Sequence, residues 1–108
     1  METKAVLTAL AALAQETRLG IFRLLVQQGP QGLPAGKIGE ALELPPATLS
    51  FHLKELSHAG LLDSRQEGRS IVYSTNFSTM NQVLGFLTEN CCGGEPCAPA
   101  GPPANGCC

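Results

Sequence analysis

The hydrophobic pattern of the chain changes its period at Gly60, and this change restricts the folds that are possible. Before Gly60, apolar residues recur at helical spacing and predict four amphipathic helices, at about 4–14, 16–28, 34–43 and 45–59. After Gly60, two short runs at 61–66 and 70–75 have the length of strands and flank a hairpin-like turn. A fifth helix is predicted at about 78–89. The predicted fold class is therefore mainly α with a small β-hairpin.

Prolines and glycines separate the predicted helices. Gly29-Pro30 stops the second helix. Leu44-Pro45-Pro46 forms a turn before the fourth, because the residue before a proline avoids the helical region while a proline is tolerated at the first helical position. Two helices joined by a turn and followed by a two-stranded wing make a winged helix-turn-helix. In that layout the second helix of the pair enters the major groove of DNA and the wing tip lies along the backbone.

Apolar stripes on the predicted helices indicate which residues face the core. Each stripe turns one face of its helix inward and leaves the opposite face polar. The inward residues predicted in this way are Val6, Leu10, Leu13, Leu19, Phe22, Leu25, Val26, Ile38, Leu42, Leu49, Leu53, Leu56, Met80, Val83, Leu84 and Leu87.

Length and composition predict one folded domain, over residues 1–92, followed by a tail. Hydrophobic residues are 44% of the 108 residues and charged residues 15%, which is a globular composition. Residues 93–108 hold four glycines and four prolines, which is typical of a flexible tail. No apolar run approaches the roughly 20 residues that a membrane span needs. We therefore expect a soluble, cytoplasmic protein without a membrane partner.

Few basic residues are available for contacts with nucleic acid. Lys and Arg total seven and the net charge is −2, which excludes strong non-specific DNA binding. Any affinity must come from a few well-placed groups, doubled in a dimer. No acid lies between Leu44 and Lys54, so the positive end of the fourth helix is free to meet phosphates. The predicted DNA-binding residues are Ala47, Thr48, Ser50, Phe51, His52 and Lys54 on the outward face of that helix, and Arg69 at the wing tip.

Three motifs, in order, resemble those of the ArsR/SmtB repressors. Residues 14–19 (AQETRL), followed by Ile21, are similar to the stretch A-D-P-T-R-L-x-I of that family. Residues 49–56 (LSFHLKEL) with 59–62 (AGLL) look like its recognition-helix signature, and Glu67-Gly68-Arg69 with Val72-Tyr73 resembles its wing. The resemblance implies a homodimer formed through the first and last helices, with recognition helices spaced for a palindromic double-stranded operator.

The chain departs from the family pattern at three positions. Gln15 and Glu16 stand where an aspartate and a proline are frequent, and we expect slight fraying at the start of the second helix. Phe51 occupies a position that is often basic in the family, so the resemblance leaves open how this position contacts the bases. For His52 we expect a role facing DNA or supporting the contact, although this histidine could instead pack within the recognition helix.

The five cysteines all lie between Cys91 and Cys108, so they predict a metal or metalloid site rather than a disulfide framework. In one site of the resembling family, a C-x-C motif begins the helix before the recognition helix, and residues 33–37 here contain no cysteine. The zinc and nickel members use Asp, His and Glu on the last helix, and 78–89 has no histidine, so neither of these two sites is expected here.

The cluster Cys91-Cys92-x-x-x-x-Cys97 is the predicted metal site. Adjacent cysteines have Cα atoms about 3.8 Å apart, whereas disulfides prefer about 5.5–6 Å. Both thiolates can converge on one soft ion, and residues 93–96 let Cys97 join them. Three thiolates suit trivalent arsenic or antimony better than zinc, which seeks a fourth ligand. Some arsenic-responsive members of the family carry a similar C-terminal cluster. Cys107 and Cys108 are possible auxiliary ligands.

The sequence thus predicts a repressor of arsenic-resistance genes that arsenite, acting as inducer, releases from its operator. Alternative signals are antimony, methylated arsenic, lead, cadmium or an oxidant. A different class, a thiol-based protein that sequesters or delivers the metalloid and uses the fold only to dimerise, also stays open. No nucleophile is paired with a base, so we expect no enzyme. No organic cofactor is predicted.

Overall fold

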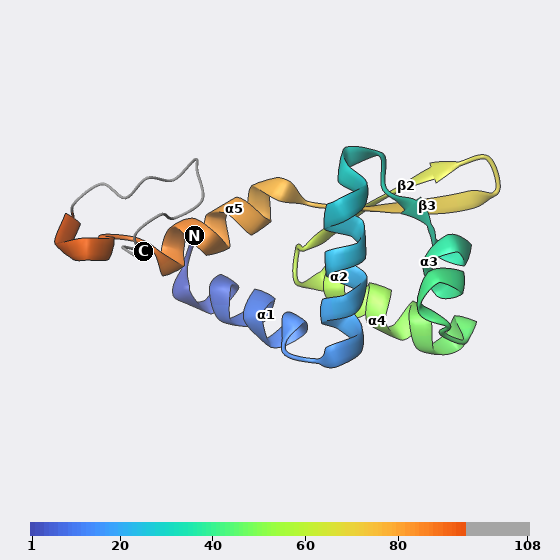
Figure 1. Cartoon of the computed structure of the whole chain (residues 1–108), viewed down its shortest axis with the longest axis horizontal. Helices are drawn as coiled ribbons and strands as arrows, with labels where there is room; N and C mark the ends of the chain where they lie inside the picture. Colours follow the sequence, from blue (N-terminus) through green and yellow to red (C-terminus); the bar gives the residue numbers. More distant parts are fainter. Residues whose placement is uncertain (95–108) are drawn as a thin grey trace.

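The computed structural model of the chain describes residues 1–94 and shows the helical fold with a small antiparallel sheet that the sequence predicts (Figure 1). The predicted tail and its cysteines from Cys97 onward lie outside the described residues, so the division at residue 92 stays a prediction. The elements in chain order are α1 (Thr3–Leu13), α2 (Glu16–Gln28), the 3-10 helix η1 (Gly29–Gln31), β1 (Leu33–Pro34), α3 (Ala35–Leu42), α4 (Pro46–His58), β2 (Leu62–Glu67), β3 (Ser70–Thr75), α5 (Phe77–Leu87) and the 3-10 helix η2 (Cys91–Gly94).

The sheet has the strand order β1-β3-β2, with both pairs antiparallel. β2 and β3 form the wing, and Gly68 at its turn has a φ of 64°, in the left-handed region that glycine adopts without strain. Strand β1 was not predicted from the sequence, and it pairs Leu33 with Tyr73 and Pro34 with Val72. A strand of two residues has no alternation that could reveal it.

Gly32, just before β1, lies so close to β3 that any side chain would be excluded. A Cβ atom there would overlap the carbonyl oxygen of Tyr73, and the φ of Gly32 is 66°. We expect Gly32→Ala to lower the free energy of unfolding by at least about 2 kcal/mol, through backbone strain and overlap. Gly20→Ala, inside α2 with open space around it, should leave stability unchanged or raise it by up to about 1 kcal/mol. Urea unfolding curves measure both, and equal midpoints would contradict this packing.

The core is formed where α1, α2, α3, α4 and α5 meet the sheet. Three positions predicted to face inward are instead exposed: Leu19 by 43%, Leu84 by 52% and Leu87 by 56%. Leu19 lies at the margin of the face that α2 buries, while the two α5 leucines line an open hollow beside α1. The buried apolar residues are Val6, Ala9, Ala12, Ile21, Phe22, Leu25, Ile38, Leu49, Leu53, Leu56, Leu61, Leu62, Val72 and Val83.

The helices place two separate surfaces at the two ends of the molecule. α1 and α5 pack together at one end, while α3 and the wing lie at the other (Figure 1). α4 begins beside α3 and runs past α2, so that its C-terminal half contacts α1. Within residues 1–94 no single helix is long and apolar enough to cross a bilayer. α1 and the segment 16–31 reach that length only as a pair, and they meet at a bend of 100°.

The start of α2 is capped rather than frayed. The side chain of Gln15 accepts a hydrogen bond of 2.9 Å from the backbone N–H of Arg18, and Glu16 places a negative charge in the first turn, where the helix dipole favours it. The fraying expected at the start of α2 was therefore wrong, because the Gln15 side chain caps the helix as an aspartate at this position would.

Candidate nucleic-acid interface

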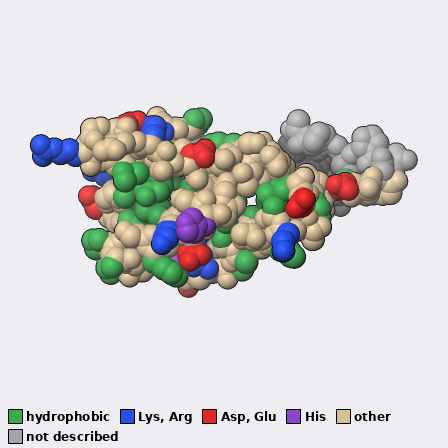
Figure 2. All heavy atoms as spheres, turned by 180° about the vertical axis from the view of Figure 1, so that it is seen from behind, with side chains coloured by type: hydrophobic (Ala, Val, Ile, Leu, Met, Phe, Trp, Pro, Cys, Tyr) green, Lys and Arg blue, Asp and Glu red, His purple; other side chains and the backbone are tan. Residues whose placement is uncertain are grey.

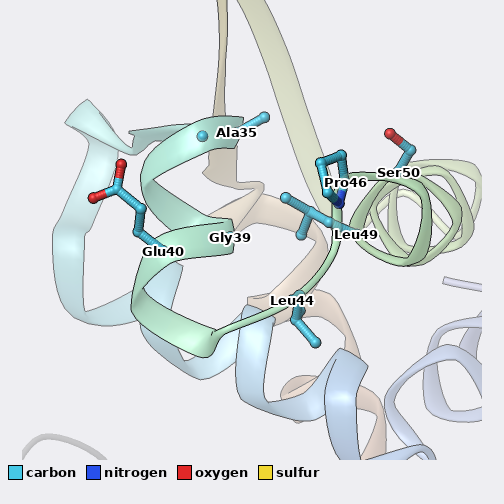
Figure 3. Close-up of a pocket in the computed structure, with 8 residues that line it drawn as sticks. Ala35, Gly39, Glu40, Leu44, Pro46, Leu49 and Ser50 are labelled. Carbon is cyan, nitrogen blue, oxygen red and sulfur yellow. The ribbon is translucent and has the colours of Figure 1, made fainter.

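α3 and α4 form a helix-turn-helix that is held by a tight turn. Glu43 ends α3 in the left-handed conformation with a φ of 54°, and the N–H of Leu44 donates to the carbonyl oxygen of Gly39 at 3.0 Å. An added Cβ on Gly39 would meet the Leu49 side chain at 3.3 Å, so the helices approach closely there. Figure 3 shows the open hollow that remains between them, with Leu49 and Ser50 reaching it from α4.

The N-terminus of α4 presents unpaired backbone donors. Pro45 is the N-cap and provides no side-chain hydrogen bond, and the first turn holds no acid. Pro46 lacks an N–H, so the free donors of this turn are those of Ala47 and Thr48, neither of which has a partner among the described residues. Both residues are exposed. The positive end of the helix dipole is therefore open to a phosphate.

The outward face of α4 carries most of the residues that the sequence analysis selected. Thr48, Ser50 and Lys54 are exposed and can donate hydrogen bonds, and Phe51 is 55% exposed. The prediction that His52 shares this face was wrong, since only 9% of it is exposed. Its position, one residue after Phe51, turns it toward the side on which α4 buries Leu49 and Leu56.

His52 is held by Arg18, whose part in the site the sequence analysis missed. The guanidinium Nη1 of Arg18 lies 3.3 Å from His52 Nδ1, and its Nε donates to the carbonyl oxygen of Ala12 at 2.7 Å. Arginine only donates, so Nδ1 is the acceptor. Arg18 thus ties the end of α1 and the start of α2 to α4. The sequence did carry a sign of this role, because Arg18 lies in the first of the three family motifs, at residues 14–19.

The wing brings Arg69 to the same side as α4. Ser50 of α4 and Arg69 of the wing turn line one hollow, together with Gly36 at the start of α3. Arg65, by contrast, is engaged within the protein, because it is paired with Glu67 of the same strand and donates to the carbonyl oxygen of Gln31 in η1. The structure therefore brings together two of the predicted DNA contacts, Ser50 and Arg69, which are far apart in the sequence.

Comparison with known proteins identifies the family of this helix-turn-helix. A family model described as a helix-turn-helix domain matches residues 13–65. The HTH-type transcriptional regulator YceK of Bacillus subtilis is 38% identical over 77 residues, which cover 70% of this chain and 76% of YceK. The solved ArsR-like transcriptional regulator from Rhodococcus sp. RHA1 superposes with a TM-score of 0.69 at 27% identity, covering 78% of this chain and 76% of that one.

The chain belongs to the ArsR/SmtB-type family of helix-turn-helix transcriptional regulators. The transcriptional activator HlyU of Vibrio cholerae is 32% identical over 77% of this chain and 74% of its own length. Its solved structure has a TM-score of 0.65 at 29% identity, covering 81% of this chain and 97% of HlyU. These relatives are regulators, which confirms that this member of the family is not an enzyme.

Charged side chains of both signs are interspersed on one face of this ArsR-type regulator. On the face drawn in Figure 2, Lys and Arg side chains stand singly among acidic ones rather than in one basic patch. This agrees with the net charge of −2. The contacts with phosphate must therefore be few and specifically placed.

The two terminal helices of this ArsR-type regulator share an apolar surface. A hollow between α1 and α5 is lined by apolar side chains alone: Leu10, Leu13, Phe22, Leu61, Met80, Val83, Leu84 and Leu87. Leu7, close to it on α1, is also 59% exposed. Contiguous exposed apolar side chains on a domain of this size mark an interaction surface.

The cysteine cluster follows directly after α5. The chain leaves this helix at Thr88, turns at Asn90 with a φ of 57°, and enters η2 at Cys91. Cys91 is partly exposed, its N–H donates to the carbonyl oxygen of Thr88 at 3.0 Å, and its sulfur is disulfide-bonded in this structure.

The rest of the predicted metal site cannot be placed in the same way. The side chain of Cys92 and the residues Cys97, Cys107 and Cys108 lie outside what the structure describes. No group of three His, Cys, Asp or Glu side chains suited to a metal occurs in the described part of this regulator. The metal site stays a prediction.

Proposed function

We propose that this regulator binds operator DNA as a homodimer and represses transcription until trivalent arsenic reaches its C-terminal cysteines. The observation that carries the DNA-binding part is the surface of α4. Its first turn has free backbone donors and no acid, Lys54 is exposed on the same helix, and Ser50 shares a hollow with Arg69. These groups match phosphate and base edges, and the wing supplies a second contact with the backbone.

The apolar surface of α1 and α5 supports the homodimer. Leu84 and Leu87 are more than half exposed in one protomer, and they line a hollow without any polar atom. In a homodimer with twofold symmetry, which is the common arrangement, the apolar surface of each protomer would cover that of the other. This pairing leaves both α4 helices free, so that they can enter successive major grooves about 34–36 Å apart.

The cysteines and their position support the proposed signal. Cys91, Cys92 and Cys97 supply three soft thiolates, which is the donor set that trivalent arsenic and antimony prefer. Cys91 is linked to the last turn of α5 through the carbonyl oxygen of Thr88. Drawing the three cysteines together would shift the end of α5, and with it the dimer that sets the spacing of the recognition helices. An allosteric coupling of this kind is typically worth about 1–3 kcal/mol.

A second candidate signal is an oxidant, because the sulfur of Cys91 is disulfide-bonded in this structure. A peroxide would take two electrons and two protons from a pair of thiols, and the resulting disulfide would constrain the same end of α5. Arsenite needs the reduced thiolates. The two signals therefore separate in one comparison, in which arsenite acts on the reduced protein and peroxide acts without arsenite.

The DNA-binding part is tested by removing charges at the proposed contacts. We expect Lys54→Ala and Arg69→Ala each to weaken binding to a duplex selected by the wild-type protein by roughly tenfold. Each change should also lower the salt dependence of the logarithm of affinity by about two per dimer, because one phosphate contact is lost from each protomer. Fluorescence anisotropy at several salt concentrations measures both quantities.

The control for this experiment is Lys4→Ala, which removes the same charge from the exposed surface of α1, at the other end of the molecule. It should leave the salt dependence of binding nearly unchanged. If Lys4→Ala had the same effect as Lys54→Ala and Arg69→Ala, only net charge would matter and the proposed interface would be wrong.

A further inference from the structure

Phe51 is an unusual residue for the surface that meets DNA. Its ring is 55% exposed on α4. Ala47, four residues before it, and Lys54, three residues after it, lie on the same face of the helix, because residues at these spacings are neighbours. Both are exposed. A large group that can neither donate nor accept a hydrogen bond therefore stands on the exposed face of α4, between a small alanine and a lysine.

The ring of Phe51 is held in place by the residue that follows it. The Phe51 and His52 rings pack edge to face, with centroids 5.2 Å apart and an angle of 66° between their planes. His52 is buried and is anchored in turn by Arg18, which donates to the end of α1. The contact with His52 therefore restricts the Phe51 ring, so that little side-chain freedom is lost when DNA covers it.

The major groove offers an exposed phenyl ring one well-matched partner. Every base edge there displays hydrogen-bond donors or acceptors, and covering these with an apolar ring leaves them unpaired. Thymine also carries a 5-methyl group, which projects into the groove and gains from contact with an apolar side chain. The chemistry thus distinguishes thymine from the other three bases without any hydrogen bond.

We propose that Phe51 is a specificity-determining residue that selects thymine in each operator half-site through the 5-methyl group. This inference rests on the proposed DNA-binding function and adds to it the base that this side chain reads. Thr48 and Ser50 then supply polar contacts beside it, and Arg18 and His52 act as positioning residues that fix the ring.

The test removes the methyl group from the DNA and the ring from the protein separately. Reduced wild-type protein first selects its preferred duplex from a randomised library. Each thymine of a half-site is then replaced by uracil, which differs by the methyl group alone. At one position we expect binding to weaken about fourfold, the contribution of one buried methyl group, and about sixteenfold when both half-sites are changed.

The protein variants show whether Phe51 is responsible. Phe51→Ala should bind the thymine and uracil duplexes equally, while Phe51→Leu, which keeps an apolar side chain, should retain part of the preference. Because the ring is largely exposed, both variants should fold, and circular dichroism checks this. In the wild type, 5-methylcytosine at the same position should bind better than cytosine.

Two kinds of failure are distinguishable. If the wild type binds its selected duplex but is indifferent to uracil at every thymine, the inference is wrong while the proposed function stands. The inference is equally wrong if Phe51→Ala keeps the thymine preference, or if the selected half-site holds no thymine. If the library yields no preferred sequence at all, the proposed function itself is overturned.

Discussion

Replacing both Leu84 and Leu87 with glutamate should separate the dimer and weaken operator binding by at least about 100-fold. The two leucines are more than half exposed on α5 and line the apolar hollow beside α1. In a symmetric dimer the double substitution would bring four carboxylates into one apolar interface, where unpaired charges cost several kcal/mol. A single protomer would then hold one half-site and lose the gain in affinity that comes from binding two half-sites at once.

Analytical ultracentrifugation measures the dimer, and fluorescence anisotropy measures operator binding. The matched control replaces Asn81 and Gln82, exposed residues of α5 outside the hollow, with glutamate, and so adds the same charge. The control should remain dimeric and bind the operator. A Leu84→Glu, Leu87→Glu protein that stayed dimeric would show that the dimer forms elsewhere. A monomeric one that bound as tightly as the wild type would remove dimerisation from the account of DNA recognition.

Replacing both Cys91 and Cys92 with serine should abolish tight arsenite binding, with a loss of at least about 100-fold. Two of the three proposed thiolates would be lost, and a serine hydroxyl is a hard, weak ligand for a soft centre. Titration of reduced protein, followed by the ultraviolet absorption of the arsenic–thiolate bond, measures affinity and stoichiometry. The reduced wild-type protein should saturate near one arsenic per chain.

The matched control for the cysteine variant replaces Cys107 and Cys108, which removes as many thiols from outside the proposed set. It should bind arsenite as the wild type does. Equal losses in the two variants would show that the thiols act without a defined site. Cys97→Ser then distinguishes the ligands, because a dispensable Cys97 would favour a methylated arsenic species that needs only two thiolates.

The pattern of the sequence was sufficient to predict the helices and the wing. The predicted bounds of α2 and β3 agree with the structure, because each has a clear period and ends at a proline, a glycine or an asparagine. Strand β1 was missed because it is defined only by its pairing with β3, which is distant in sequence. The N-cap of α2 was misjudged because the length of the Gln15 side chain allows a bond that spacing alone does not reveal.

The outward face of α4 was predicted correctly except at His52. His52 was assigned to the outward face because it is polar. It is buried instead, beside Arg18, which lies 34 residues away in the sequence and so leaves no sign in the local pattern. The exposure of Leu84 and Leu87 has the opposite cause. Their helical period was recognised correctly, but no element within residues 1–94 buries them, and both stay more than half exposed. Local periodicity does not report long-range pairing, nor would it report burial against a second copy of the chain of the kind we propose for α5.

The most direct test of the central claim is the dissociation constant of the reduced wild-type protein for its selected duplex, measured with and without one equivalent of arsenite per chain. Our account predicts tight, sequence-specific binding without arsenite and a weakening of about 5- to 150-fold with it, the range that an allosteric coupling of 1–3 kcal/mol gives. An unchanged dissociation constant, at an arsenite concentration that saturates the thiols, would contradict the proposed signal.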